Sequence, residues 1–200
     1  EIQSARGKLA GESTLEALRA VFSSIETLKA DCVALSCTGL YGVVSDPEKY
    51  LALCTEFFGA AEVAVIDDGF AAFVGALNGR DRVALTIGGG VVSIGGLNGK
   101  FAHRDGLGST FGDEGGGFWL GKTGITKALA VRQGRGDDPE MADFFKDEIA
   151  QYFELSVRDG SDAQTLAIKS AKKVLEAADA GVSTATAIVD EGAYLLAQTA

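Results

Sequence analysis

The chain has 200 residues, of which 46% are hydrophobic, so it is long enough and apolar enough for one large or two small domains. Its formal net charge of −10 argues against nucleic acid or an anionic membrane as a partner, because both favour basic surfaces. The sequence contains no apolar run of about 18 residues and no opening signal peptide, so we expect no membrane span and a cytoplasmic location.

The first 78 residues alternate helices with strands. The expected elements are a helix over Ser13–Leu28, a strand over Cys32–Ser36, a helix from Pro47 to about Phe58, a strand over Glu62–Ile66 and a short helix over Phe70–Leu77. Ser13 and Glu16 form a capping-box pattern, and Asp46 before Pro47 is typical of a helix cap. Alternating strands and helices with short turns predict a parallel sheet covered by helices.

The pattern changes at residues 78–81, where we place a domain boundary. Three antiparallel strands are expected next, over Arg82–Ile87, Val91–Leu97 and Lys100–His103. Asn98-Gly99 predicts a type I′ hairpin turn, which needs φ > 0 at both positions. Helices are then expected over Phe118–Arg132, Pro139–Phe153, Asp162–Ala178 and Thr184–Ala200. Residues 1–78 are therefore interpreted as the remainder of an N-terminal α/β domain, and residues 79–200 as the start of a C-terminal domain.

We interpret the cysteines, the histidine and the tryptophan as structural residues. Cys32 and Cys37 lie in an apolar, strand-like run, and none of the three cysteines forms a C-x-x-C pair. We therefore expect small buried thiols in a reducing compartment. His103 is expected to be an ordinary strand residue, and Trp119 is expected to pack in the core.

Three stretches carry residues suited to chemistry. Asp68 follows a buried parallel strand, where open α/β sheets bind ligands; it is either a general base or a cap of the next helix. Gly88–Gly90 joins two strands, and is either a concave turn whose N–H groups hold phosphate or a plain hairpin. Asp113, which precedes Glu114 between glycines at a helix head, either orients sugar hydroxyls or caps that helix.

Taken together, these features resemble a known family. A carboxylate turn after a strand, a glycine turn in a hairpin, and G-x-G-x-x-x-G-D-E-G before an aromatic helix are similar to the N-acetylglucosamine kinase and BadF-type ATPase family. That family belongs to the actin-like ATPase and sugar kinase superfamily. The resemblance implies an α/β, ribonuclease H-like fold of the two-domain sugar kinase type. The chain from about Ile2 to Ala200 would be its middle portion, with the first strands of one domain and the last strands of the other missing.

The resemblance also implies an activity and its residues. The activity is ATP-dependent phosphorylation of a sugar, most typically an amino sugar such as N-acetylglucosamine, with ATP and Mg²⁺ as cofactors and no protein metal ligand of its own. Asp68 matches the catalytic aspartate that takes the proton of the sugar hydroxyl. The positions that match substrate-binding residues are Thr38, Gly39, Gly106, Leu107, Gly108 and Asp113. Gly88, Gly89 and Gly90 match the second phosphate-binding turn. A homodimer is left open.

The sequence departs from the family pattern at several positions. Gly89 and Val91 replace the usual Thr and Ser of the phosphate turn, Leu107 stands where Trp is common, and Asp67 where Asn or Thr is common. The first phosphate-binding turn, D-G-G-G-T, has no match. Two alternatives therefore stand beside the kinase: a BadF-type ATPase that activates a partner enzyme, for whose cysteine-held cluster no match is found, and a non-catalytic relative that senses a sugar. The ROK-type sugar kinases, which carry a zinc-binding cysteine cluster, do not fit.

Overall fold

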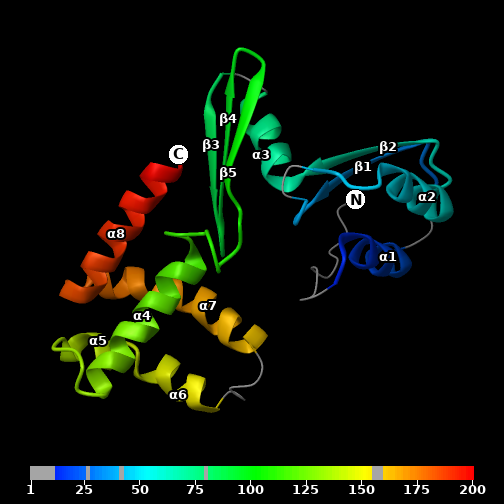
Figure 1. The fold of residues 1–200 in the computed structure, drawn as a ribbon. Helices are drawn as coiled ribbons and strands as arrows, with labels where there is room; N and C mark the ends of the chain where they lie inside the picture. Colours follow the sequence, from blue (N-terminus) through cyan, green and yellow to red (C-terminus); the bar gives the residue numbers. More distant parts are fainter. Residues whose placement is uncertain (1–11, 26–27, 41–42, 79–80, 155–159) are drawn as a thin grey trace. The chain divides into compact units, whose positions relative to one another are not determined.

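The computed structural model describes residues 12–25, 28–40, 43–78, 81–154 and 160–200. The chain divides into two compact units, Glu1–Gly79 and Arg80–Ala200, and each has its own sheet and its own helices (Figure 1). Both units combine strands and helices, which confirms the α/β class expected from the sequence. Within the described ranges, no helix is both long enough and apolar enough to cross a membrane.

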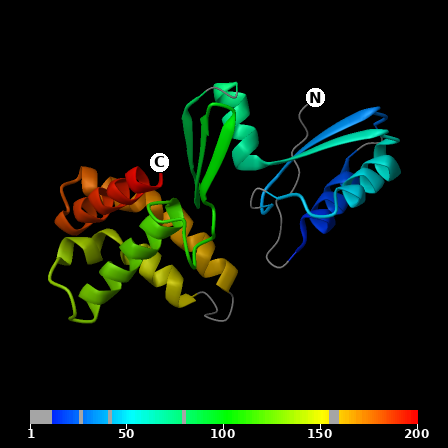
Figure 2. The same ribbon diagram turned by 45° about the horizontal axis from the view of Figure 1, so that its top comes forward.

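The first unit is a small parallel sheet with helices. Its elements are α1 (Thr14–Ser24), β1 (Cys32–Cys37), α2 (Pro47–Phe58), β2 (Glu62–Asp67) and α3 (Asp68–Leu77). β1 and β2 are parallel and in register from Cys32↔Glu62 to Cys37↔Asp67. Side chains from α1, α2 and the inner face of this sheet form one apolar core, which includes Phe22, Leu35, Leu53 and Phe58. Figures 1 and 2 both show α1 and α2 on the same face of the two strands.

Local sequence patterns in the first unit predict some helix ends correctly and others wrongly. The Ser13–Glu16 capping box is present, but α1 ends at Ser24 because Ile25 already takes an extended conformation. Asp46 does precede α2, yet its side chain makes no capping hydrogen bond; it pairs with Lys49 at 2.6 Å instead. The expectation for Cys32 was also wrong.

The cysteines show why alternation decides burial in a sheet with one covered face. Cys37 and Cys54 are buried, Cys32 is exposed, and all three are free thiols. Side chains alternate between the two faces of a strand, and the covered face of β1 carries Leu35 and Cys37. Cys32 lies on the opposite face, so an apolar neighbourhood in sequence did not bury it.

The second unit begins with an antiparallel sheet in the order β3 (Val83–Ile87), β4 (Val91–Leu97) and β5 (Lys100–Asp105). Asn98 and Gly99, which join β4 to β5, have φ values of 51° and 72°, so the expected turn with two positive φ angles is confirmed. β5 continues two residues beyond the expected end and stops at Asp105. Asp105 itself has a φ of 61° and turns the chain out of the sheet.

Helices α4 (Gly117–Arg132), α5 (Pro139–Phe144), α6 (Lys146–Glu154), α7 (Gly160–Asp179) and α8 (Ser183–Thr199) complete the second unit. Figure 2 shows them gathered at the end of the sheet where the β3–β4 turn and the loop after β5 lie. α4 and α7 approach closely at Gly121, where a Cβ would overlap the carbonyl oxygen of Ala167. Trp119 is partly buried against the helical core, as expected.

The helix expected over Pro139–Phe153 is two helices instead. Phe145 interrupts the helical geometry between α5 and α6, with φ −101° and ψ 14°. Its ring is completely buried and lies against Gly124 of α4, where an added Cβ would meet it at 2.9 Å. Periodicity alone does not indicate this break, which falls at a residue buried against another helix.

Candidate functional site

The first group of candidate residues follows the ends of β1 and β2. Because Cys37 pairs with Asp67 in parallel register, Thr38 and Asp68 come next at the same edge of the sheet. Asp67 is the N-cap of α3, and its Oδ1 accepts from the Gly69 N–H at 3.1 Å. Asp68 is the first helical residue; its Oδ1 accepts from the same N–H at 2.9 Å, and its side chain is exposed. Asp67 is thus the N-cap residue, and Asp68, which shares the Gly69 N–H with it, has an exposed carboxylate.

Cys37 lies close enough to Asp68 to respond to its charge. Burial raises the pKa of the Cys37 thiol, and the negative charge of Asp68 raises it further. Burial also raises the pKa of Cys54. A thiol with a raised pKa stays protonated near neutral pH and is a poor nucleophile. At this sheet edge, Asp68 is therefore the better candidate for proton transfer.

The second group lies in the other unit and starts with the Gly88–Gly90 turn. The Gly88 N–H donates to the Gly90 carbonyl at 2.9 Å. Among the residues that the structure describes, the N–H groups of Gly89 and Gly90 have no hydrogen-bond acceptor. None of the three glycines takes a positive φ. None of them is therefore needed for left-handed backbone, and at Gly89 and Gly90 other side chains approach too closely for a Cβ.

Asp113 is joined directly to this turn. Its Oδ1 accepts from the Val91 N–H at 2.8 Å, and a Cβ added to Gly90 would lie 2.6 Å from the same carboxylate oxygen. The backbone N–H of Asp113 donates to Asp105 Oδ1, also at 2.8 Å. Asp113 itself has a φ of 60°. The Asp113 carboxylate is thus held against the glycine turn by Val91, and the Asp113 backbone is held by Asp105.

Asp113 and Glu114 do not cap α4, which corrects one of the two roles considered for Asp113. The N-cap of α4 is Gly116, and no side chain bonds to the first turn there. The N–H groups of Gly117 and Phe118 donate instead to the carbonyls of Gly88 and Gly89, at 2.8 and 2.9 Å. These amides need partners at any helix start. The glycine turn supplies them, so the turn, the acidic loop and α4 form one hydrogen-bonded assembly.

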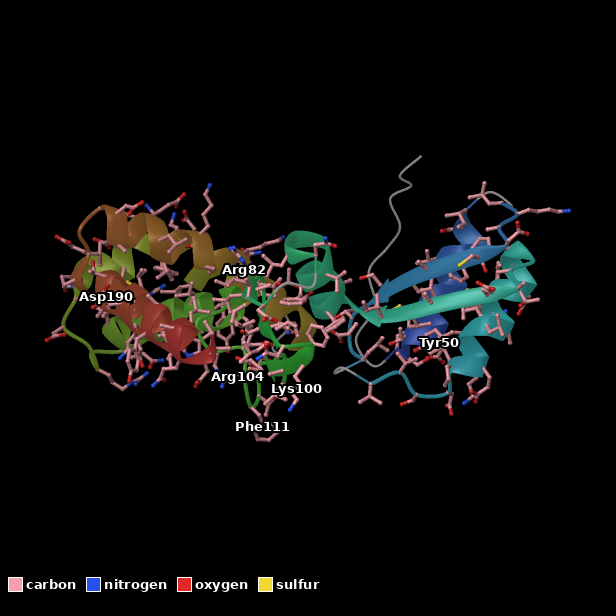
Figure 3. All side chains as sticks on the ribbon, turned by 90° about the horizontal axis from the view of Figure 1, so that it is seen from above. Tyr50, Arg82, Lys100, Arg104, Phe111 and Asp190 are labelled. Atoms are coloured by element: carbon pink, nitrogen blue, oxygen red, sulfur yellow. The ribbon has the colours of Figure 1, made fainter. Side chains whose placement is uncertain are left out.

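Backbone hydrogen bonds hold the loop between Gly106 and Gly112 in place. Gly106 and Gly108 have φ values of 69° and 80°, in the region that favours glycine. The Gly106 N–H donates to the Val91 carbonyl, and the Gly112 N–H donates to the Gly108 carbonyl at 2.9 Å. Leu107 and Phe111 project outward, 60% and 85% exposed, and Phe111 stands at the outer end of the loop in Figure 3. The loop therefore offers glycine backbone and apolar side chains next to Asp113.

Asp105 was not singled out from the sequence, although it holds Asp113 in place. Its carboxylate fits against Gly112, where any Cβ would overlap Oδ1. The available signal was the dipeptide Asp105-Gly106, which is typical of a turn at the end of a strand. That signal was missed because the strand was expected to end at His103. His103 lies within β5 and is exposed.

Mg²⁺ requires oxygen ligands in a nearly octahedral arrangement. Within the described ranges, no three His, Cys, Asp or Glu residues gather closely enough to hold a metal ion. Mg²⁺ is usually bound by one or two carboxylates together with substrate phosphates and water, not by a protein cage. Two amide donors beside the Asp113 carboxylate fit a phosphate that brings its own Mg²⁺.

Comparison with known proteins shows a likeness to solved structures. No family model matches the sequence, and no curated protein sequence is significantly similar to it. Solved structures do match: a protein assigned as an N-acetylglucosamine kinase from Chromobacterium violaceum superimposes with a TM-score of 0.66 at 19% identity, over 89% of this chain and 63% of that one. A second one so assigned, from Porphyromonas gingivalis, gives 0.59 at 20% identity, over 88% and 59%.

The comparison confirms, at the level of the fold, the resemblance expected from the sequence. This chain spans about three fifths of the length of those two proteins. At such identities the likeness concerns the fold alone. The roles of individual residues therefore rest on the geometry of this chain.

Proposed function

We propose that the chain is the middle portion of an ATP-dependent sugar kinase with a two-domain, ribonuclease H-like fold. The observation that carries the proposal is the bond between Asp113 Oδ1 and the Val91 N–H, 2.8 Å long. It joins a carboxylate suited to sugar hydroxyls to a turn with two amide donors suited to phosphate. A kinase must bring these two ligand chemistries together, and this assembly has them side by side.

In this proposal each stretch has a distinct task. Asp113, with the backbone of Gly106 and Gly108, binds the sugar, and the N–H groups of Gly89 and Gly90 bind a phosphate of the nucleotide. Thr38 and Gly39 contribute to sugar binding from the first unit. The substrate is an amino sugar such as N-acetylglucosamine. Bound Mg²⁺ would neutralise charge on the phosphates, and most of the rate enhancement would come from positioning.

Asp68 is the proposed general base. It accepts the proton of the sugar hydroxyl as that oxygen attacks the terminal phosphorus of ATP, and ADP leaves. Support comes from its exposed carboxylate at the carboxyl end of β2 and from the separate use of Asp67 as the helix cap. In this proposal Asp67 serves as the N-cap residue and Asp68 as the base, and both accept from the Gly69 N–H.

The test uses the full-length protein with Mg²⁺, ATP and a panel of amino sugars. We expect phosphorylated sugar, and we expect Asp68→Asn to lower kcat by about 10²–10⁴-fold without a change in melting temperature. Asp67→Asn is the matched control, because it changes the adjacent carboxylate that caps α3. Near-normal turnover in Asp68→Asn would exclude this residue as the base.

The same experiment separates the alternatives. Sugar binding without ATP turnover in the wild type would indicate a non-catalytic sugar sensor, for which the missing hydroxyl groups at Gly89 and Val91 already provide a reason. ATP hydrolysis that no sugar stimulates would favour an ATPase acting on a partner enzyme. Either result would overturn the kinase proposal.

A further inference from the structure

The three glycines of the Gly88–Gly90 turn face different surroundings. A Cβ added to Gly88 would meet no atom within 4 Å, whereas one added to Gly90 would meet the Asp113 carboxylate. One added to Gly89 would meet the side chain of Ile168, with Cδ1 at 3.1 Å, Cγ1 at 3.6 Å and Cγ2 at 3.9 Å. All three outer carbons of Ile168 thus lie over the place where a side chain at position 89 would stand.

Ile168 is held in this position by the packing of α7 on α4. Ala167, the preceding residue, fills the notch at Gly121, and Val174 lies against Gly124. Ile168 itself is 38% exposed, so it is not a core residue. One side of its side chain contacts the glycine turn and another side faces solvent.

We propose that Ile168 is a selectivity and positioning residue of the anion site at the glycine turn. Its alkyl side chain forms an apolar wall over Gly89, so that the turn binds phosphate through the backbone N–H groups of Gly89 and Gly90 without a side-chain hydroxyl. The inference rests on the proposed function, from which it takes its ligand, a nucleoside triphosphate. The contact between Ile168 and Gly89 does not depend on that ligand.

Two physical consequences follow from an apolar wall at this place. Water is kept from one side of the amides, and amide-to-anion hydrogen bonds are stronger where the local dielectric is low. A hydroxyl-bearing residue at position 89 cannot enter unless Ile168 gives way. Gly89 and Ile168 therefore constrain each other, because a larger side chain at position 89 needs a smaller one at position 168.

A double-mutant cycle in the full-length protein tests the pairing without any ligand. We expect Gly89→Thr to lower the melting temperature in the wild-type background, and Ile168→Ala to relieve most of that loss. Ile168→Val should relieve only part of it, since it removes Cδ1, the nearest carbon at 3.1 Å, but keeps the two Cγ carbons at 3.6 and 3.9 Å. Equal losses from Gly89→Thr with and without Ile168→Ala would overturn the pairing.

A charge series tests the anion site, with ATP and inorganic triphosphate as probes. Because Ile168 contacts Gly89, a carboxylate at position 168 would lie within about 6 Å of a bound phosphate, so Ile168→Glu should weaken binding by about tenfold or more. Ile168→Lys should strengthen it, and both effects should shrink at high salt. Leu175, 46% exposed on the same helix, provides the matched control: Leu175→Glu should leave binding unchanged.

The two measurements separate the inference from the proposed function. If the wild type binds neither ATP nor triphosphate, the proposed nucleotide site fails, and the cycle still decides whether Ile168 shapes the turn. If the wild type binds both probes and the Glu and Lys variants bind as the wild type does, Ile168 is not part of the site and the inference is wrong.

Discussion

Gly90→Ala is expected to be the most damaging alanine substitution in the glycine turn. The new Cβ would lie 2.6 Å from both Cγ and Oδ1 of Asp113, so the carboxylate must move and its bond to the Val91 N–H is lost. A hydrogen bond to a charged group contributes about 1.5–3 kcal/mol to stability. For a chain of this length, such a loss lowers the melting temperature by about 3–12 °C.

Gly88→Ala is the matched control, because its Cβ would meet nothing within 4 Å. Its effect should stay within about 0.5 kcal/mol, as for most unconstrained surface positions. Asp113→Ala should cost about as much as Gly90→Ala, and the double variant less than the sum, because both remove one interaction. Calorimetry on the four variants measures these differences. Equal losses at Gly88 and Gly90, or strict additivity of Gly90→Ala and Asp113→Ala, would refute the reasoning.

Two further predictions concern the helices of the second unit. Gly121→Ala should unfold this unit or lower its melting temperature severely, since the Cβ would overlap the Ala167 carbonyl, and circular dichroism of the variant checks this. Hydrogen bonds from Thr184, Met141 and Ser183 hold the pKa of Asp138 below its usual range. Its contribution to stability is therefore present above its unfolded pKa of about 3.9 and is lost as pH falls below that value. The melting temperatures of the wild type and Asp138→Ala should differ at pH 7 and converge in acid; a constant gap would contradict this role.

Features with a local cause could be predicted from the sequence. The Ser13–Glu16 capping box and the Asn98-Gly99 turn each depend on a few adjacent residues, and both are present. The parallel pairing of β1 with β2 was also expected, because apolar strands separated by a helix favour it. In the described residues β2 pairs with β1 alone.

Features with a distant cause could not be predicted from the sequence. The helix break falls at Phe145, whose ring lies against Gly124 of another helix, and the carboxylate of Asp113 bonds to an amide 22 positions earlier in the chain. From the sequence, Asp113 had two candidate roles, orienting sugar hydroxyls or capping the adjacent helix. The bond to Val91 is a third role, and it removes the helix cap from consideration.

Gly89 and Gly90 are confined by neighbouring side chains, and they also carry the amide groups that we propose bind phosphate. Glycine is usually required where φ is positive, yet none of the three glycines in this turn has a positive φ. Gly89 and Gly90 are small because Ile168 and Asp113 stand against them, and those two neighbours differ in kind: one is apolar and one is charged. A phosphate at the free amides would therefore meet an apolar wall on one side and a carboxylate on the other. Since the carboxylate repels a bare anion, binding at this turn should depend on a cation that accompanies the phosphate, and ATP affinity measured with and without Mg²⁺ is the direct measure of that dependence.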